Sequence, residues 1–218
     1  MKIGVLGTGM VGDAIASKLV ELGHQVMMGS RSAANEKAIA FSAKYPEGKA
    51  FSGTFADAAA FGEIIFNCTK GLETLNILKS AGEENMKGKI LVDIANPLDF
   101  SNGMPPSLSV CNTNSLGEQI QQAFPDVKVV KSLNTMNCII MVNPASVNGG
   151  DHNVFMSGND KEAKSKVAEI LTSFGWWPEN IIDLGDIKTA RGTEMILPVW
   201  LSLMMSRGNA AFNLKVVS

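Results

Sequence analysis

The chain has 218 residues, a formal net charge of −2 and 45% hydrophobic residues. This length supports one sizeable domain, or one domain with a small appendage, and a large buried core. The low net charge and the scattered basic residues exclude nucleic acid and an anionic membrane as evident partners. Three cysteines and two histidines lie far apart without metal-ligand spacing. The odd cysteine number and the lack of a secretory signal favour a reducing cytoplasm.

The first predicted elements are a short apolar strand over residues 2–6 and an apolar helix over residues 14–22. Between them stands a glycine turn, Gly7-Thr8-Gly9-Met10-Val11-Gly12. In this pattern the first glycine allows the tight turn, the second lets a pyrophosphate approach the backbone, and the third lets the helix lie close to the strand. Free N–H groups at the helix N-terminus then face the phosphates, so the pattern predicts a dinucleotide-binding site.

The end of the second predicted strand, over residues 25–28, indicates which dinucleotide is preferred. An NAD enzyme usually has Asp or Glu there to hold the ribose 2′-hydroxyl. This chain has Ser30 and Arg31, and no acid lies between Glu21 and Glu36. A hydroxyl and a guanidinium suit a 2′-phosphate dianion, which favours NADP(H). Alternatively, Arg31 only caps a solvated loop.

Strand and helix patterns alternate through the rest of the chain, which is typical of a parallel sheet covered on both faces. We therefore expect a Rossmann-type doubly wound, mainly parallel α/β sheet, with a dinucleotide-binding domain over residues 1–150 and a small C-terminal α/β lobe over residues 151–218. The apolar run 195–205 is interrupted by Pro198 and is too short to span a membrane, so it is read as a buried helix. The strands are predicted at 49–52, 63–68, 89–94, 127–132, 153–157 and 181–184, the helices at 34–45, 54–61, 72–81, 115–124, 161–174 and 187–208, and a long loop at 96–112.

Ligands of such sheets bind at the carboxyl ends of the strands, so the residues that follow each strand are further candidates. Lys70 could meet a phosphate or a substrate anion, or it could be an ordinary exposed lysine. The amides of Asn96 and Asn134 could lie beside the nicotinamide carboxamide, although turn formation alone would also explain Asn96-Pro97. The candidates at these strand ends are Cys68, Thr69 and Lys70, then Ala95, Asn96 and Pro97, and finally Asn134.

Several segments together resemble the coenzyme F420-dependent NADP oxidoreductase family. They are the glycine turn with residues 29–31, the segment 129–135, and the segments 157–160, 183–185 and 190–194. The resemblance implies a Rossmann domain with a small C-terminal lobe, and hydride exchange between NADP(H) and a deazaflavin or flavin-like acceptor. It also implies a dimer, with the acceptor between the C-terminal lobe and the nicotinamide. The chain is similar, too, to the NADPH-oxidising domain of membrane metalloreductases.

Few side chains could act as a proton donor beside a hydride acceptor. His24 is expected at a solvent-facing turn, Pro46 breaks the helix that would align Tyr45 with Lys49, and His152 alone remains plausible. A flavin or deazaflavin ring absorbs the transferred charge itself, so no catalytic residue is predicted.

Two function classes remain open. The first is an NADPH-dependent oxidoreductase that acts on a flavin, an F420-like deazaflavin or another small acceptor. The second is an NADP(H)-binding sensor or partner protein without turnover. A hydroxyacid or imine reductase would usually need a longer helical second domain. The last predicted helix should use an apolar face in the acceptor pocket and a homodimer interface, or in the core of one subunit; the face comprises Ile196, Leu197, Trp200, Leu203 and Met204.

Overall fold

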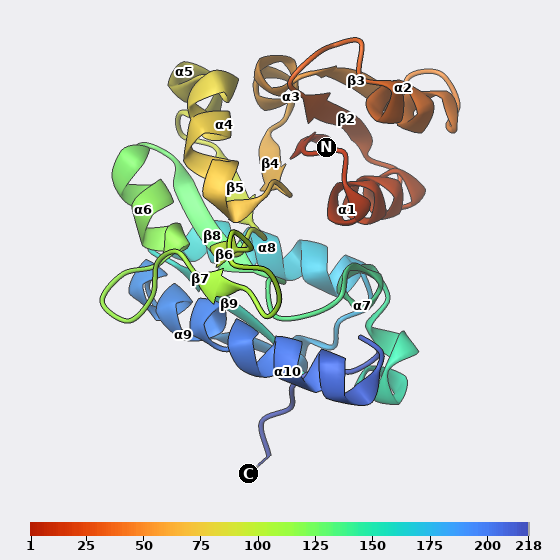
Figure 1. Ribbon diagram of the computed structural model, residues 1–218. Helices are drawn as coiled ribbons and strands as arrows, with labels where there is room; N and C mark the ends of the chain where they lie inside the picture. The colour runs from red at the N-terminus through yellow and green to blue at the C-terminus, as the bar shows by residue number, and fades with distance from the viewer. Residues whose placement is uncertain (218) are drawn as a thin grey trace.

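An eight-stranded sheet runs through the protein, whose computed structural model describes residues 1–217 (Figure 1). The strand order is β10-β9-β8-β5-β4-β1-β2-β3. The six strands β8, β5, β4, β1, β2 and β3 run parallel to one another. This order confirms the Rossmann-type doubly wound sheet, in which the chain returns to the centre after β3 and continues outward through β4. The strands are β1 (Lys2–Leu6), β2 (Gln25–Ser30), β3 (Ala50–Thr54), β4 (Ile64–Asn67), β5 (Ile90–Asp93), β8 (Lys128–Ser132), β9 (Val154–Gly158) and β10 (Ile181–Asp183).

Helices cover both faces of the sheet, so the central strands are buried on both sides and lack polar alternation. One face carries α1 (Met10–Glu21), α2 (Glu36–Ala43), α7 (Cys138–Val142) and α8 (Lys161–Ser173). The other face carries α3 (Phe55–Phe61), α4 (Thr74–Ala81), α5 (Glu83–Met86), α6 (Leu116–Ala123) and α9 (Ala190–Met195). Short 3₁₀ turns lie at Gly71–Glu73, Pro144–Ser146, Asn148–Gly150, Pro178–Asn180 and Ile187–Thr189.

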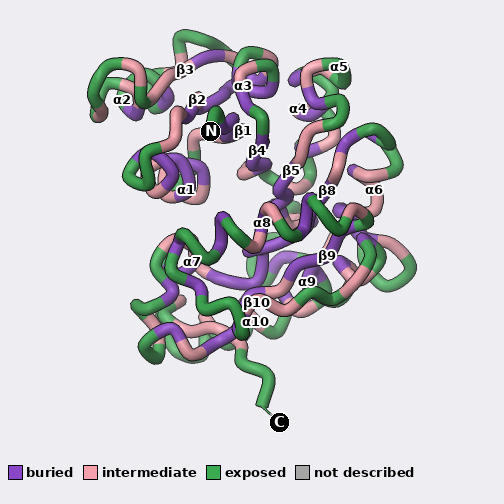
Figure 2. The backbone as a smooth tube through the Cα atoms, turned by 180° about the vertical axis from the view of Figure 1, so that it is seen from behind, coloured by how far each residue is buried: buried purple, intermediate pink, exposed green. Residues whose placement is uncertain are grey.

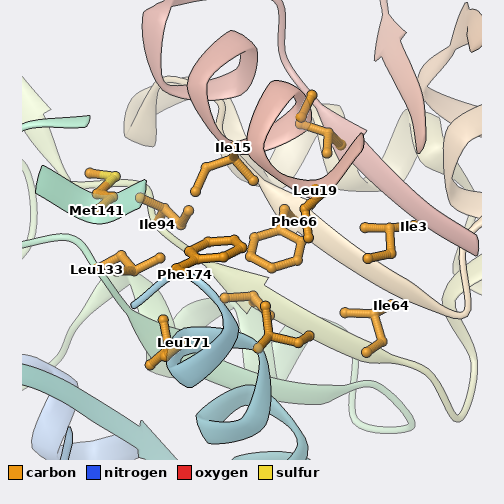
Figure 3. Close-up of a cluster of buried hydrophobic side chains, with 14 of the residues drawn as sticks. Ile3, Ile15, Leu19, Ile64, Phe66, Ile94, Leu133, Met141, Leu171 and Phe174 are labelled. Atoms are coloured by element: carbon orange, nitrogen blue, oxygen red, sulfur yellow. The ribbon is translucent and has the colours of Figure 1, made fainter. Parts of the chain in front are cut away.

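The core of the first face joins the two halves of the sequence (Figure 3). Ile15 and Leu19 of α1 lie above the sheet, with Phe66 of β4 beside them. Phe174, which follows α8, and Leu171 of α8 enter the same cluster. The segment after residue 150 thus extends the same sheet and packs into the same core. A functional division near residue 150 stays a prediction.

β9 reverses the direction of the sheet because it pairs antiparallel with β8, and β10 then runs parallel to β9. The chain therefore leaves β10 at the edge opposite the carboxyl ends of the six parallel strands. It returns through α9, where Thr189 at the start lies 2.7 Å from the Ser157 hydroxyl and Glu194 near the end reaches Lys131 of β8.

The segments after β5 and after β8 differ from the sequence-based expectation. The long loop 96–112 contains a hairpin of β6 (Leu98–Asp99) and β7 (Ser107–Leu108), and α7 was not predicted at all. Neither the two-residue strands nor the five-residue helix is long enough to show a hydrophobic period. Ser115 caps α6: its hydroxyl accepts the Glu118 N–H at 3.1 Å and donates to the Glu118 carboxylate, and its backbone N–H donates to the Asn114 side chain.

The predicted helix over residues 187–208 is a 3₁₀ turn, α9 and α10 (Leu197–Arg207) in succession. Pro198 lies in the first turn of α10, where its missing N–H is tolerated, and this interrupts the helix. The prediction of a buried helix at 195–205 is wrong, because only Leu197 and Leu201 of α10 are buried (Figure 2). Of the predicted apolar face, Leu197 points into the protein, while Leu203 is 38% exposed.

Candidate dinucleotide and hydride-acceptor site

The turn between β1 and α1 has room for glycine alone at two positions. Gly7 has φ +118°, and a Cβ there would lie 2.7 Å from the carbonyl oxygen of Cys68. A Cβ on Gly12 would lie 2.1 Å from the carbonyl oxygen of Gly7. These contacts confirm that Gly7 forms the tight turn and that Gly12 brings α1 against it.

Gly9 differs from its two neighbours in the motif, because a Cβ there would meet nothing within 4 Å. Gly9 is the N-cap of the 12-residue helix α1, and no side chain caps this helix. Open space thus lies in front of an uncapped, partially positive helix end. Thr8 and Val11 complete the turn, and Met10 is 82% exposed at the start of the helix.

The end of β2 lies beside this turn, since the Gly7 N–H donates to the Gly29 carbonyl at 3.0 Å. The buried hydroxyl of Ser30 donates to the Ser32 carbonyl at 2.6 Å, which closes a local turn. Arg31 is exposed and forms no salt bridge within residues 1–217. Its guanidinium can therefore turn toward a ligand at the carboxyl end of β2.

The end of β4 contributes the next predicted group. Asn67 is fully buried, and its side-chain oxygen accepts the Thr69 hydroxyl at 2.7 Å. Burial raises the pKa of the Cys68 thiol, and the charge of Asp93 raises it further, so Cys68 is neutral and unsuited to act as a nucleophile. Lys70 is exposed.

A pair of amides joins the ends of β5 and β8. The Asn134 side-chain NH₂ donates to the Asn96 side-chain oxygen at 2.9 Å, and the Asn96 NH₂ donates to the Asn134 carbonyl at 2.8 Å. Asn134 also donates to the Thr193 carbonyl of α9 at 2.9 Å. Leu133 holds the turn with φ +63°, an unusual conformation for a leucine. The predicted residues Ala95, Asn96, Pro97 and Asn134 thus lie together and contact the C-terminal segment.

The candidate proton donors are either buried in the structure or distant from the strand ends. His152 is buried, with Nε2 2.9 Å from the Pro144 carbonyl and Nδ1 2.7 Å from the Asn213 amide, so the histidine judged most plausible is a structural one. Tyr45 packs against Phe41 beneath α2, and His24 lies at the opposite end of β2 from Ser30. His24 and Tyr45 thus lie away from the carboxyl ends of the parallel strands. His152 precedes the antiparallel strand β9 at that edge, but it is buried and held by hydrogen bonds within the protein. Within residues 1–217, no cluster of metal-ligating side chains is present.

Sequence reasoning missed four buried polar residues beneath these loops: Asn67, Asp93, Lys131 and Glu194. Each of the first three stands near the end of an otherwise apolar strand, which was the available signal. The sequence-based search considered the residues that follow each strand, so it did not include these side chains within the strands. Glu194 has no comparable signal, because its helix is too short to show which side faces inward.

One open hollow of about 400 Å³ lies away from these strand ends, beside α6. Its lining includes Asn114, Gln121 and Lys188. It does not coincide with the glycine turn or the amide pair, and it lacks the apolar walls of most ligand sites.

The sheet and its glycine turn define the class of Rossmann-type dinucleotide-binding proteins. Residues 2–97 match the family of coenzyme F420-dependent NADP oxidoreductases. The chain is also 53% identical to an Arthrobacter sp. FB24 protein named as a candidate F420-dependent NADP-reductase, with a TM-score of 0.92 and 100% of both chains covered. The chain belongs to the coenzyme F420-dependent NADP oxidoreductase family.

More distant relatives share the fold but are longer. Metalloreductase STEAP3 of Rattus norvegicus is 28% identical over 91% of this chain and 38% of its own length. The chain spans less than two fifths of the metalloreductases it matches. An Aspergillus terreus reductive aminase, solved with NADPH and a ketone, shares 16% identity and a TM-score of 0.66 over 94% of this chain and 62% of its own.

Proposed function

We propose that the protein binds NADP(H) across the carboxyl ends of β1, β2, β4, β5 and β8 and transfers hydride between it and a planar ring acceptor, a flavin or an F420-like deazaflavin. Gly9 carries the proposal: it is the motif glycine at which the fold leaves open space, and that space lies before an uncapped helix end. A pyrophosphate fits there sterically and electrostatically.

Each remaining part of the dinucleotide has a group of matching chemistry. Ser30 and Arg31 would hold the 2′-phosphate through a hydroxyl and a bidentate guanidinium. Cys68, Thr69 and Lys70 would border the middle of the cofactor. Asn96 and Asn134 would orient the nicotinamide carboxamide through their amides. When bound, the nicotinamide supplies or accepts the hydride, and the chain's own residues orient it and exclude water.

The acceptor class follows from the side chains at this edge. His24 and Tyr45 lie away from it, and both ring nitrogens of the buried His152 are hydrogen-bonded within the protein, so none of the three candidates is placed to act as the acid that carbonyl reduction requires. A flavin or deazaflavin accepts hydride into its own ring system and takes its proton from solvent. Met10, Leu72 and Ile139 are exposed apolar side chains in the helical turns that follow β1, β4 and β8, and they would offer a flat ring an apolar surface.

Oxidation of NADPH, followed by the loss of absorbance at 340 nm under anaerobic conditions, tests this function. F420, FMN, riboflavin and a ferric complex serve as alternative acceptors. We expect turnover with at least one ring acceptor, and none in the Gly9→Val variant. Tight NADPH binding without oxidation in any mixture would instead support the second candidate, an NADP(H)-binding sensor or partner protein.

We also propose that the protein is a homodimer and works in the reducing cytoplasm. Val199 and Leu203 are 55% and 38% exposed, and they lie one turn apart on α10. An apolar stripe of this kind is typical of an interface between subunits. Cys68, Cys111 and Cys138 are all free, which agrees with a reducing compartment. Within the described residues, no helix has both the length and the apolar character needed to cross a bilayer.

A further inference from the structure

A line of buried polar side chains crosses the sheet beneath the proposed nicotinamide end of the site. The Asn67 NH₂ donates to Asp93 Oδ1 at 2.7 Å. Lys131 Nζ lies 2.8 Å from Asp93 Oδ2 and 2.9 Å from Glu194 Oε1. All four side chains are at most 1% exposed, so they interact without competition from water.

Each charge in this line of side chains has a partner of opposite sign. Glu194 accepts the backbone N–H of Leu116 at 2.7 Å and that of Gly117 at 3.0 Å. The partially positive N-terminus of α6 therefore stabilises the negative charge of the Glu194 carboxylate. Burial by itself lowers the pKa of Lys131, but Asp93 and Glu194 outweigh burial and raise it. Lys131 is therefore held in its charged form between the two carboxylates.

The same groups fix the turn that carries the amide pair. Asp93 Oδ1 accepts the Ala95 N–H at 3.2 Å, and Lys131 Nζ donates to the Ala95 carbonyl. The next residue is Asn96, which pairs with Asn134, and Asn134 in turn bonds to the carbonyl of Thr193 beside Glu194. The loops after β5 and β8 are thus attached to α9 both at the amide pair and at the buried charges.

Stability alone is a weak reason for such an arrangement, because a buried ion pair seldom stabilises a fold more than apolar side chains of the same size. Its distinctive effect is to hold neighbouring groups in one orientation. We propose that Lys131 and Glu194 are positioning residues: they orient Asn96 and Asn134 toward the nicotinamide, and they hold α9 beside the nicotinamide. This inference rests on the proposed NADP(H) function.

The test compares Glu194→Gln and Lys131→Met with Glu118→Gln as a matched control. Glu118 also links α6 to α9, through an ion pair with Arg191, but it has no contact with Lys131. In both test variants we expect kcat for NADPH oxidation to fall by about tenfold or more, because small misplacements of reacting groups are costly. The deuterium isotope effect with C4-deuterated NADPH should rise, since hydride transfer becomes the slow step.

Affinity for 2′,5′-ADP, which lacks the nicotinamide, should stay unchanged in all three variants. The proposal is overturned if Glu194→Gln and Lys131→Met lose thermal stability but retain the kcat and isotope effect of the control. If these variants do not fold, Glu194→Asp keeps the charge but shortens the side chain, and it should show the same split between kcat and 2′,5′-ADP binding. If the unaltered protein neither binds 2′,5′-ADP nor oxidises NADPH, the proposed function itself fails.

Discussion

Three glycines of one motif have different steric reasons for their presence, and Gly9 gives the sharpest test of the phosphate site. Gly9→Val adds a side chain where the fold leaves open space. We expect it to abolish NADPH binding, measured by calorimetric titration, while the circular dichroism spectrum and melting temperature remain close to those of the unaltered protein.

Gly12→Val is the matched contrast, because its Cβ would lie 2.1 Å from a backbone oxygen of the same turn. This variant should lose both NADPH binding and thermal stability. Normal NADPH binding by Gly9→Val would show that the pyrophosphate does not lie in front of α1.

We expect Arg31 to determine the preference between NADPH and NADH. Arg31→Ala should weaken NADPH binding by about 1.5–3 kcal/mol, the usual range for a hydrogen bond to a charged group, while NADH binding changes little. Titration of both cofactors into both proteins gives this comparison. Equal affinities of the unaltered protein for NADPH and NADH would contradict the assignment of Ser30 and Arg31.

The residues at this scale also show where sequence reasoning ends. The glycine turn could be predicted because its pattern is local: Gly7, Gly9 and Gly12 lie in one short stretch between a strand and a helix. The contact of Glu194 with Lys131 and with the start of α6 could not, because it joins residues 78 positions apart in the case of Leu116. No local pattern specifies such a pair.

Among the elements, α6 and α9 are linked by an ion pair at the rim as well as by the buried carboxylate. Arg191 Nε lies 2.8 Å from Glu118 Oε2, and its Nη2 bonds to the other oxygen. The hydrogen bond from Arg191 is the main cause that lowers the pKa of Glu118, and Ser115 adds to it. The pair therefore stabilises the fold only while Glu118 is ionised.

Arg191→Gln tests this linkage through its pH dependence. Because the pKa of Glu118 is lower in the folded than in the unfolded chain, its contribution is complete above the ordinary glutamate pKa and is lost as the pH falls through the lowered value. The variant should melt at a lower temperature than the unaltered protein at pH 7, and the difference should shrink in acid. A difference in melting temperature that is constant from pH 7 to pH 3 would contradict this account.

Element prediction succeeded for the apolar strands of the sheet and for the longer helices. The strands of the sheet and helices such as α8 follow their expected ranges within a few residues. It failed for the last helix because Pro198 divides it, and the buried and exposed sides of α9 and α10 are set by tertiary contacts. Ile187 and Ala190 pack into the core, whereas Val199 faces outward.

For the whole molecule, the outward side of α10 predicts the oligomeric state. The double variant Val199→Asp, Leu203→Asp places two charges on the exposed stripe and should convert a dimer to a monomer, as measured by light scattering. NADPH binding should persist, because the glycine turn lies at the opposite side of the fold (Figure 1).

Ile39→Asp is the control for this prediction, since Ile39 is 47% exposed on α2, away from α10. It should leave the oligomeric state unchanged. A double variant that stays dimeric would show that α10 does not form the interface.

The return of the chain through α9 also sets an order of events during synthesis. Lys131 and the start of α6 acquire their partner Glu194 only after residue 194 has left the ribosome, so the buried charges of the cofactor-binding half cannot all be paired before then. Such distant pairing slows folding. A nascent chain that ends at Asp186 should therefore remain sensitive to protease, although it carries every strand of the sheet; a protease-resistant fragment with a cooperative melt would refute this order.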